Sequence, residues 1–164
     1  MQKTNIIRDY LEDLVDGRAF WPHSVYATYS ESLADFRDPQ NKGIAIQLLN
    51  ELIVNALELV PSCLAYLDIV SRGDPRVFFF CAVPQGMAIA SLAELYGNEK
   101  VFTGVVKISK MRAARMILDF SQDSKSIRAW FIQCAGIIAA KAKVADDKTA
   151  IAASERVIEL AAKK

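Results

Sequence analysis

Apolar residues recur at helical spacing along most of this chain, and that periodicity is the strongest constraint on its fold. The clearest case follows residue 43, where one helix face would carry Ile44, Leu48, Leu49, Leu52, Ile53, Ala56, Leu57 and Val60. Pro61 is expected to kink or split this helix, because proline removes a backbone donor, and the pattern resumes at Leu64 and Leu67. With 52% hydrophobic residues, seven glycines and five prolines, the 164 residues favour one helical domain with a large interior.

The run from Val77 to Pro84 is rich in aromatic and β-branched residues, and by itself it could be a buried strand. No partner strand is found elsewhere, and the following residues are helical in pattern. We therefore predict one buried helix over 77–96, with a bend at Pro84 and an end at Gly97-Asn98.

The remaining elements follow from the same patterns. We expect a first helix that ends near Val15, a short helix that starts at Pro22, a polar loop over 39–43, and helices at about 101–119, 124–145 and 149–162. The chain is therefore predicted to be all-α, with roughly seven helices.

The charge and the cysteines exclude several classes of function. The net charge of +1 gives no global field that would attract nucleic acid, so no nucleic-acid partner is expected. Cys63, Cys81 and Cys134 are widely separated and cannot form a zinc site with the single His23, which favours reduced cysteines in a cytosol-facing protein. We expect no signal peptide, and no run that reaches the ~18 to 20 apolar residues of a membrane span.

The first thirteen residues contain the strongest chemical signal. Asn5, Asp9 and Asp13 are four residues apart, which stacks their side chains on one helix face, and Glu12 lies beside that face. So many adjacent acceptors repel one another unless a cation lies over them. Hard oxygen ligands with open positions suit Mg²⁺, which keeps waters and bridges to phosphates. These residues suggest a helix that holds a diphosphate through Mg²⁺; an ordinary solvated helix face is the alternative.

Five separated blocks of the sequence resemble squalene synthases, the farnesyl-diphosphate farnesyltransferases of sterol synthesis. Residues 5–13 resemble the second aspartate-rich motif of that family, and residues 17–22 (Gly-Arg-Ala-Phe-Trp-Pro) resemble its Gly-Arg-x-Phe-Trp-Pro loop. The other blocks lie at 49–57, at 80–90 with the run Phe-Cys-Ala-Val-Pro-Gln, and at 101–108. The resemblance covers about residues 2–118 of a single domain, and 120–164 is expected to be an unmatched helical tail.

The resemblance implies the all-α bundle of class I isoprenoid synthases, with two acidic helices facing across a central cavity. It implies that two farnesyl diphosphates are joined head to head to presqualene diphosphate with Mg²⁺, and that NADPH then gives squalene. The family places a first acidic motif upstream of the one seen here, so an incomplete bundle is expected. We expect the isolated chain to lack synthase activity and to expose apolar surface.

The resemblance also assigns roles to the charged residues. The catalytic acidic group would be Asp9, Asp13, Glu12 and Asn5, with Asp9 and Asp13 holding Mg²⁺ through the diphosphate. The diphosphate-binding residues would be Arg8, Arg18 and, at the fraying helix end, Gln2. A guanidinium matches phosphate geometry; surface pairing of the arginines with Asp35 or Glu12 is the alternative.

A farnesyl chain needs a dry apolar surface that keeps water away from carbocations, and aromatic faces stabilise a passing cation. The residues assigned to this substrate pocket are Phe78, Phe80, Cys81, Pro84, Gln85 and Met87. Packing in an ordinary core is the alternative for them.

NADPH phosphates meet a Lys-Ile-Arg-Lys segment in the family. The corresponding residues here are Lys107, Ile108, Ser109 and Lys110. Together with Arg8, the cofactor-binding residues would be Lys107, Ser109 and Lys110, although serine offers a hydrogen bond without a charge. Plain surface lysines are the alternative.

Two other functions remain open on the sequence alone. One is a phytoene or dehydrosqualene synthase that works without NADPH, and the other is a non-catalytic helical fragment. The family sits on the cytosolic face of the endoplasmic reticulum membrane through a C-terminal anchor, so membrane association is expected by resemblance, while no anchor is expected within these 164 residues. A monomer that binds farnesyl diphosphate is expected.

Overall fold

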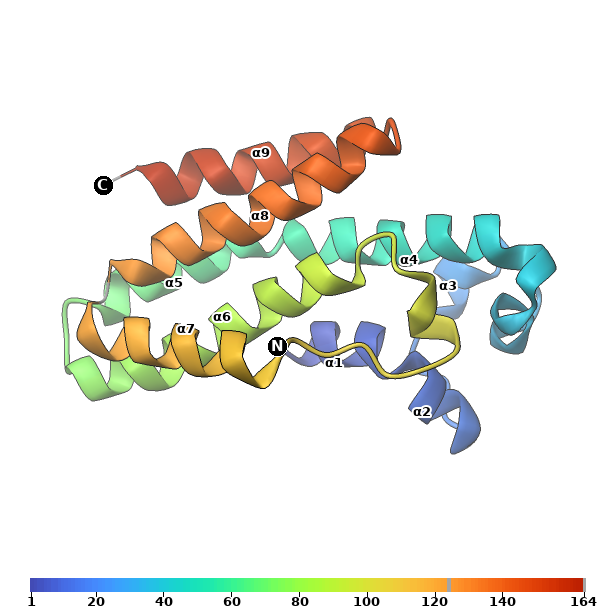
Figure 1. The fold of residues 1–164 in the computed structure, drawn as a ribbon, viewed down its shortest axis with the longest axis horizontal. Helices are drawn as coiled ribbons and strands as arrows, with labels where there is room; N and C mark the ends of the chain where they lie inside the picture. Colours follow the sequence, from blue (N-terminus) through green and yellow to red (C-terminus); the bar gives the residue numbers. More distant parts are fainter. Residues whose placement is uncertain (124, 164) are drawn as a thin grey trace.

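The computed structural model describes residues 1–123 and 125–163, and all regular elements within these ranges are helical (Figure 1). The all-α prediction is therefore confirmed. The α-helices are α1 (Gln2–Arg8), α2 (Tyr10–Val15), α3 (His23–Tyr26), α4 (Lys42–Leu57), α5 (Val60–Val70), α6 (Pro75–Leu95), α7 (Lys110–Gln122), α8 (Ser126–Val144) and α9 (Lys148–Ala162). Three short 3₁₀ helices, η1 (Leu33–Arg37), η2 (Pro39–Asn41) and η3 (Glu99–Phe102), lie between them.

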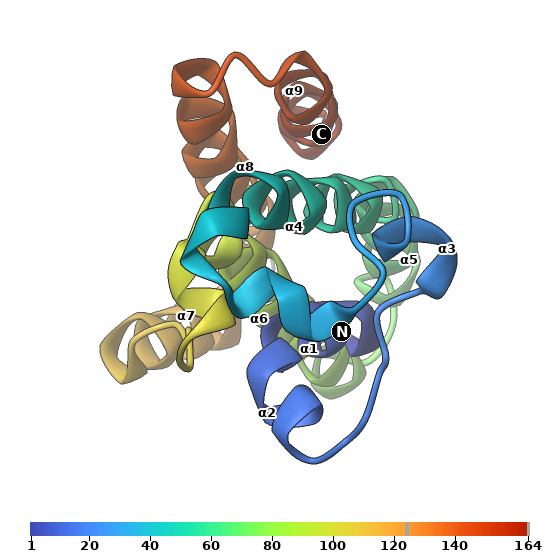
Figure 2. The ribbon, with the colours of Figure 1, turned by 90° about the vertical axis from the view of Figure 1, so that its right-hand side faces the viewer.

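The helices form stacked layers around α4, α5 and α6. Helices α8 and α9 form a hairpin in which α9 packs against α4 and α5 and α8 packs against α6 (Figures 1 and 2). Helix α1 packs against both α4 and α6, and α7 packs against α6 and α8 at the edge of the bundle.

Prolines and caps explain the main boundaries. Helix α4 ends before Glu58, and Pro61 lies in the first turn of α5, where a missing N–H is tolerated. Helix α6 begins at Pro75, with the Asp74 carboxylate accepting a hydrogen bond from the Arg76 N–H at 2.8 Å. The helix continues through Pro84 and ends before Gly97, whose φ of +66° suits glycine. The predicted single helix over 77–96 is confirmed.

Three boundaries differ from the sequence-based expectations. The expected polar loop at 39–43 is instead η2 followed by the first turn of α4. The helix expected over 101–119 begins only at Lys110, because the β-branched residues after Gly104 disfavour a helix and Ser109 caps the start of α7. Pro22 is the cap of α3 rather than its first residue.

The core is built from one face of each long helix. Its most deeply buried large side chains include Leu48, Leu49, Ile53, Leu57, Ile89, Leu95, Met116 and Ile138. Between α8 and α9 the contacting residues are mostly small, and Ala135, Ala142 and Ala150 are fully buried there. Small side chains let the two helices approach closely, and α8 and α9 accordingly make the most extensive contact between elements.

Within the described residues, two helical stretches, Pro39–Val70 and Pro75–Leu95, are long and apolar enough by length and composition to cross a membrane. The sequence-based expectation was that no unbroken apolar run reaches span length, which is a different criterion. The share of the most apolar window that is buried inside the fold is 39% and 50%. Core helices of soluble proteins pass the same test, so the finding is weak evidence for a span.

Candidate active site

The acidic segment is a helix with a break at its central carboxylate. Asp9 has φ −88° and ψ 17°, and it separates α1 from α2, so the continuous helix expected up to Val15 is not formed. The hydrogen bonds nevertheless continue across the break, from the Asp9 N–H to the Asn5 carbonyl and from the Asp13 N–H to the Asp9 carbonyl, each at 2.8 Å. Asn5, Asp9 and Asp13 therefore keep the one-turn spacing that the sequence predicted.

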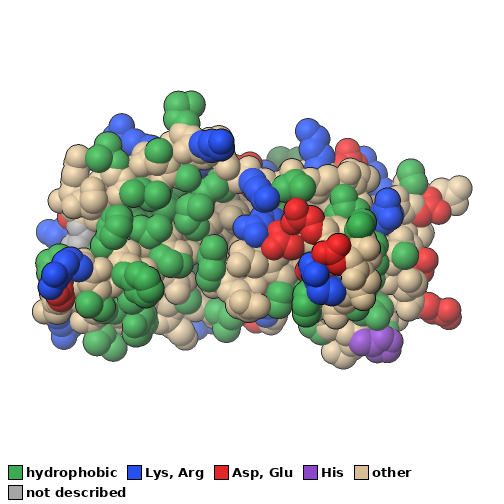
Figure 3. Space-filling model, turned by 90° about the horizontal axis from the view of Figure 1, so that it is seen from below, with side chains coloured by type: hydrophobic (Ala, Val, Ile, Leu, Met, Phe, Trp, Pro, Cys, Tyr) green, Lys and Arg blue, Asp and Glu red, His purple; other side chains and the backbone are tan. Residues whose placement is uncertain are grey.

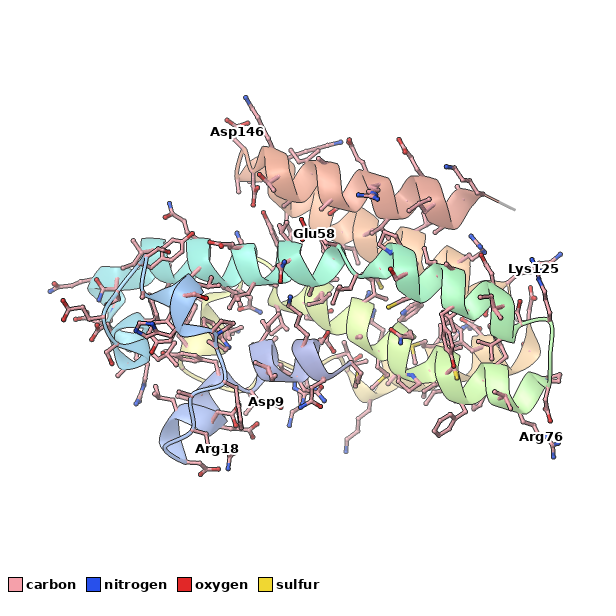
Figure 4. The ribbon with its side chains drawn as sticks, turned by 180° about the vertical axis from the view of Figure 1, so that it is seen from behind. Asp9, Arg18, Glu58, Arg76, Lys125 and Asp146 are labelled. Carbon is pink, nitrogen blue, oxygen red and sulfur yellow. The ribbon has the colours of Figure 1, made fainter. Side chains whose placement is uncertain are left out.

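Both candidate arginines pair with carboxylates of this segment rather than with Asp35 or Glu12. Arg8 donates two parallel hydrogen bonds to Asp9, from Nε to Oδ1 at 2.7 Å and from Nη2 to Oδ2 at 2.9 Å. Arg18 donates to Asp13 Oδ1 at 3.0 Å and lies 2.9 Å from Asp16 Oδ2. Hydrogen bonding to Asp13 raises the pKa of Arg18, so this side chain stays cationic. Figure 4 shows Asp9 and Arg18 at the same end of the molecule.

An open hollow of about 580 Å³ lies over α2 and the turn after it, lined by Asp9, Leu11, Glu12, Asp13, Val15, Asp16 and Arg18. Four of its lining residues are carboxylates, and Arg8 and Arg18 balance only part of their charge. No group of three or more His, Cys, Asp or Glu residues within the described part of the chain could hold a metal alone. A metal here would take its other ligands from a bound anion or water, as Mg²⁺ does with phosphates.

Asn5 does not line this hollow. Its Oδ1 atom is buried and has no hydrogen-bond partner within the described residues. The fit to a cation rests instead on the lining carboxylates. Asp9, Glu12 and Asp13 offer the hard oxygen ligands that Mg²⁺ takes beside a bound diphosphate.

Gln2 lies beside a different cavity. That cavity has a volume of about 620 Å³, lies between α1, α4 and the loop before α3, and is lined by Gln2, Lys3, Ile6, Ile7, Phe20, Trp21, Pro22, Val25, Glu51, Leu52, Val54, Asn55, Glu58 and Thr149. Gln2 does not line the acidic hollow. The first cavity is lined by residues of α1, whereas the acidic hollow is lined by α2 and its flanking residues.

The loop that follows the acidic segment is anchored by an aromatic cluster. Trp21 is buried, its ring centroid lies 4.8 Å from that of Tyr10, and Phe102 packs on both rings. The Trp21 indole N–H donates to the Ile6 carbonyl at 3.0 Å. These contacts hold the loop that carries Arg18 against α1 and α2. Trp21 is thus structural, as the sequence suggested, while His23 is exposed.

An exposed apolar strip runs along α6 beside α1. Phe80 is 77% exposed, and Pro84 and Met87 lie on the same helix face and are half-buried. We call Val77, Phe80, Pro84 and Met87, with Tyr66 and Ile69 of α5, the apolar wall. Figure 3 shows hydrophobic side chains gathered over this side of the molecule. Large exposed apolar patches of this kind mark binding surfaces.

Phe78 and Gln85, which were also assigned to the substrate pocket, lie on another face of α6. Phe78 is buried at 5% exposure, and Gln85 is two turns further along the same face. Cys81 lies at the edge of the apolar wall, where its Sγ is 3.6 Å from the Tyr66 hydroxyl. The structure therefore brings Phe80, Pro84, Met87 and Cys81 together and separates Phe78 from them.

Sequence reasoning missed Tyr66 and Ile69, which are 51% and 70% exposed on α5. They reach the apolar wall because α5 and α6 form a hairpin, which periodicity within one segment does not reveal. The only sequence signal that could have pointed to these two residues was the helical apolar pattern that resumes after Pro61.

The expected cofactor segment lies before and at the start of α7. Lys107 and Lys110 are exposed and belong to no ion pair within the described residues. The Ser109 hydroxyl accepts a hydrogen bond from the Arg112 N–H at 3.2 Å, so it caps the helix. Two lysines without ion-pair partners beside a helix N-terminus could bind a phosphate group. Ser109 serves as the N-cap of that helix.

Cys63 and Cys134 do not offer a reactive thiolate. Burial raises the pKa of Cys63, and it raises the pKa of Cys134 to about 11. Both thiols are therefore protonated at neutral pH, where the thiolate would be the reactive form. Burial also raises the pKa of Tyr10 to about 12, which keeps this hydroxyl as a donor to the Leu33 carbonyl.

The chain is similar in sequence to squalene and phytoene synthases. The family model for squalene/phytoene synthases matches residues 1–112. The squalene synthase of Mus musculus is 52% identical over 119 residues, which cover 73% of this chain and 28% of the mouse protein. Squalene synthase 1 of Arabidopsis thaliana is 47% identical over 120 residues, 71% of this chain and 29% of that protein. The chain thus spans less than a third of these curated relatives.

Solved structures extend the similarity to the C-terminal helices. Two complexes of TcSQS, with the ligands E5700 and BPH1237, match with a TM-score of 0.89 at 33% and 34% identity. Each match covers 98% of this chain and 47% of the solved chain. Since the sequence matches cover at most 73% of the chain, the structural match also includes most of α8 and α9.

Proposed function

The chain belongs to the squalene/phytoene synthase family, and from that premise we propose that it forms part of a squalene synthase active site. The reaction would join two farnesyl diphosphates head to head to presqualene diphosphate and then reduce the rearranged product to squalene. The observation that carries the proposal is a break in an acidic helix, with Asp9 and Asp13 one turn apart, and the packing of the preceding helix α1 against α6, the helix that exposes Phe80.

In this proposal the acidic segment holds the diphosphate. Asp9 and Asp13 would hold Mg²⁺, with Asn5 and Glu12 supporting the network, and the ion when bound neutralises charge that develops on the leaving group. Arg8 and Arg18 are already positioned by these carboxylates and can turn their remaining donors to phosphate oxygens. Asp16 holds Arg18 from its other side. The two guanidinium groups would therefore already be in position before the substrate binds.

The apolar wall would hold the farnesyl chain and exclude water. Phe80 offers an aromatic face on which a positive carbon can be stabilised. Pro84, Met87 and Cys81 continue the apolar surface beside it and would help to keep water away from the carbocation. Gln85 and Phe78 would support this surface from behind.

Lys107 and Lys110 would hold the phosphates of NADPH, and Arg8 is a further candidate for that contact. Bound NADPH supplies a hydride. Ser109 would act indirectly, because its hydroxyl caps α7 and so fixes the position of Lys110. We also propose Mg²⁺ and farnesyl diphosphate as the other ligands, and the cytosolic face of the endoplasmic reticulum membrane as the location.

A chimera tests the function. This chain would replace the matching segment of the mouse squalene synthase, and farnesyl diphosphate would be supplied with Mg²⁺, with and without NADPH. We expect squalene only when NADPH is present. Reduction by NADPH would then separate this function from that of a phytoene or dehydrosqualene synthase.

The other outcomes are equally informative. Product that is indifferent to NADPH would favour the phytoene or dehydrosqualene type of synthase. A chimera that folds, as judged by its circular dichroism and melting temperature, yet consumes no farnesyl diphosphate would contradict the proposal and favour a non-catalytic role.

A further inference from the structure

Helix α6 carries a proline in its interior. Pro84 lies well inside the helix, which continues on both sides of it from Pro75 to Leu95. In an α-helix the carbonyl of each residue accepts a hydrogen bond from the N–H four residues later. Proline has no N–H, so the Phe80 carbonyl lacks the donor that would stand one turn further along. Pro75 has no such effect, because the first N–H groups of a helix have no partner within it.

The freed carbonyl belongs to the face of α6 that forms the apolar wall. Residues four apart lie on one face of a helix, so the Phe80 carbonyl lies in the row that leads from Phe80 to Pro84. Phe80 is 77% exposed and Pro84 is half-buried, and both are members of the apolar wall. One polar backbone atom is therefore set into a surface that is otherwise apolar.

Other carbonyls of α6 receive donors from neighbouring helices. The Trp130 indole N–H donates to the Gly86 carbonyl at 3.0 Å, and the Lys141 ammonium donates to the Ala93 carbonyl at 2.7 Å. Both donors come from α8, on the side where α6 packs into the bundle. Residues 77–93 include no Lys, Arg, Asp or Glu, so no charged side chain of this stretch competes for the Phe80 carbonyl.

We propose that the Phe80 carbonyl oxygen, which Pro84 leaves without a helix partner, stabilises the carbocation of the reaction. The inference rests on the proposed function, because it takes the apolar wall as the surface that holds the farnesyl chain. A farnesyl chain on the wall removes water from this carbonyl, and an unpaired carbonyl away from water is unfavourable. A positive carbon beside the oxygen compensates for that loss, and the dipole is in place before the charge develops.

The Phe80 carbonyl and the Phe80 ring would act in different ways. The ring attracts a cation through its negative face, whereas the carbonyl presents the negative end of a fixed dipole. Both attractions are stronger where water is excluded. Pro84 is then a positioning residue, which acts through the N–H that it lacks. Its effect can be separated from its shape, because any residue without an N–H at position 84 would leave the carbonyl free.

Three variants of the chimera with the mouse squalene synthase test this inference. Pro84→Ala supplies an N–H, which pairs the Phe80 carbonyl. Replacement of Pro84 by lactic acid, the α-hydroxy analogue of alanine, keeps the same methyl side chain but puts an ester oxygen in place of the N–H. The matched control is Pro75→Ala, which makes the same change in the first turn of the same helix.

The readout is a ratio of two inhibition constants. One inhibitor is a farnesyl chain that ends in a trimethylammonium group, and the other is its uncharged tert-butyl counterpart. We expect Pro84→Ala to weaken binding of the cation at least ~10-fold relative to the neutral compound, and to lower kcat for farnesyl diphosphate at least ~10-fold with little change in KM. The lactic acid form and Pro75→Ala should keep both quantities within ~3-fold of the unmodified chimera.

Two results in an active chimera would overturn the inference and leave the proposed function standing. One is an unchanged ratio in Pro84→Ala. The other is an equal loss in the alanine and lactic acid forms, which would assign the effect to the shape of Pro84. A folded, unmodified chimera that consumes no farnesyl diphosphate would overturn the proposed function and this inference with it. Circular dichroism and the melting temperature of each form confirm that only folded protein is compared.

Discussion

Cys134 lies where α6, α7 and α8 meet, and it is fully buried. The Arg112 guanidinium donates to its Sγ at 3.5 Å, but burial dominates and raises the pKa of the thiol to about 11 from an ordinary value of 9.0. The folded chain therefore binds the thiol proton more tightly than the unfolded chain does. This group contributes stability below pH 9 that is lost as the pH rises to about 11.

We therefore predict that the free energy of unfolding falls between about pH 9 and pH 11, and that Cys134→Ala makes this fall shallower. Urea titrations of both proteins across this range would measure the two slopes. The slope comparison removes the constant loss of packing in the variant. Identical slopes would mean that Cys134 is not the group that titrates.

At the scale of the helix, α6 has one face that packs and one that is exposed. Phe78→Ala should lower the free energy of unfolding by ~3 to 5 kcal/mol, because the buried ring leaves a cavity. Phe80→Ala should change it by less than ~0.5 kcal/mol, because that ring is exposed. In the chimera, Phe80→Ala should also raise the share of alcohol products in which water has captured the carbocation.

Chemical denaturation of the two variants, and product analysis of the second, would measure these effects. Phe78→Ala serves as the stability control for the neighbouring position. A large stability loss from Phe80→Ala, with no change in products, would assign this ring to the core and remove it from the apolar wall.

The contact between α6 and α7 depends on a glycine. A Cβ atom at Gly86 would lie 2.5 Å from Phe120 Cε2 and 2.7 Å from Met116 Sδ. Gly86→Ala should therefore lower the free energy of unfolding by ~1 to 3 kcal/mol through overpacking. Gly136→Ala in α8 is the matched control, since nothing lies within 4 Å of its Cβ position, and it should stabilise the helix by ~0.5 to 1 kcal/mol.

Thermal or urea unfolding of both variants measures the difference. Equal effects of the two substitutions would contradict the close packing of α7 on α6.

Sequence patterns predicted whole helices better than their ends. Helix α6 was predictable because a run of aromatic and β-branched residues without a partner strand cannot form a sheet. The break at Asp9 was not predictable, because spacing of four residues is the same in a straight helix and in one that bends between two turns. The late start of α7 depends on the Ser109 cap, which competes with the apolar pattern that begins at Val101.

At the scale of the whole molecule, the C-terminal helices belong to the same bundle. Arg128 of α8 lies 2.5 and 2.6 Å from the two carboxylate oxygens of Asp68 in α5. The same guanidinium donates to the Leu160 carbonyl at 3.0 Å and to the Ala161 carbonyl at 3.2 Å, near the end of α9. One side chain thus ties three helices together.

Arg128→Met should therefore lower the free energy of unfolding by ~1 to 2 kcal/mol and speed hydrogen exchange in α9. Arg115→Met is the control, because it removes only an exposed pair with Asp119 on α7 and should lower the free energy by less than ~0.5 kcal/mol. Urea unfolding and amide exchange measure both. Unchanged exchange in α9 would mean that its end is held by its contacts with α8 alone.

The site was predictable only where its residues are close in sequence. The acidic segment and the loop with Arg18 lie within eighteen residues, so a local pattern indicated both. The apolar wall is completed by Tyr66 and Ile69, which a hairpin turn between α5 and α6 brings to Phe80. The pairing of each arginine with its nearest carboxylate likewise depends on side-chain geometry that spacing does not specify.

The central claim is that the carboxylate at the helix break holds the diphosphate through a cation. Its most direct test is the rate of farnesyl diphosphate consumption in the chimera with Asp9→Asn, compared with Asp146→Asn. The control makes the same chemical change at an exposed turn on the far side of the molecule, where φ is 53° and asparagine is well tolerated (Figure 4). We predict a loss of at least ~100-fold for Asp9→Asn and less than ~2-fold for Asp146→Asn. Equal, near-normal rates in a folded Asp9→Asn chimera would contradict the account.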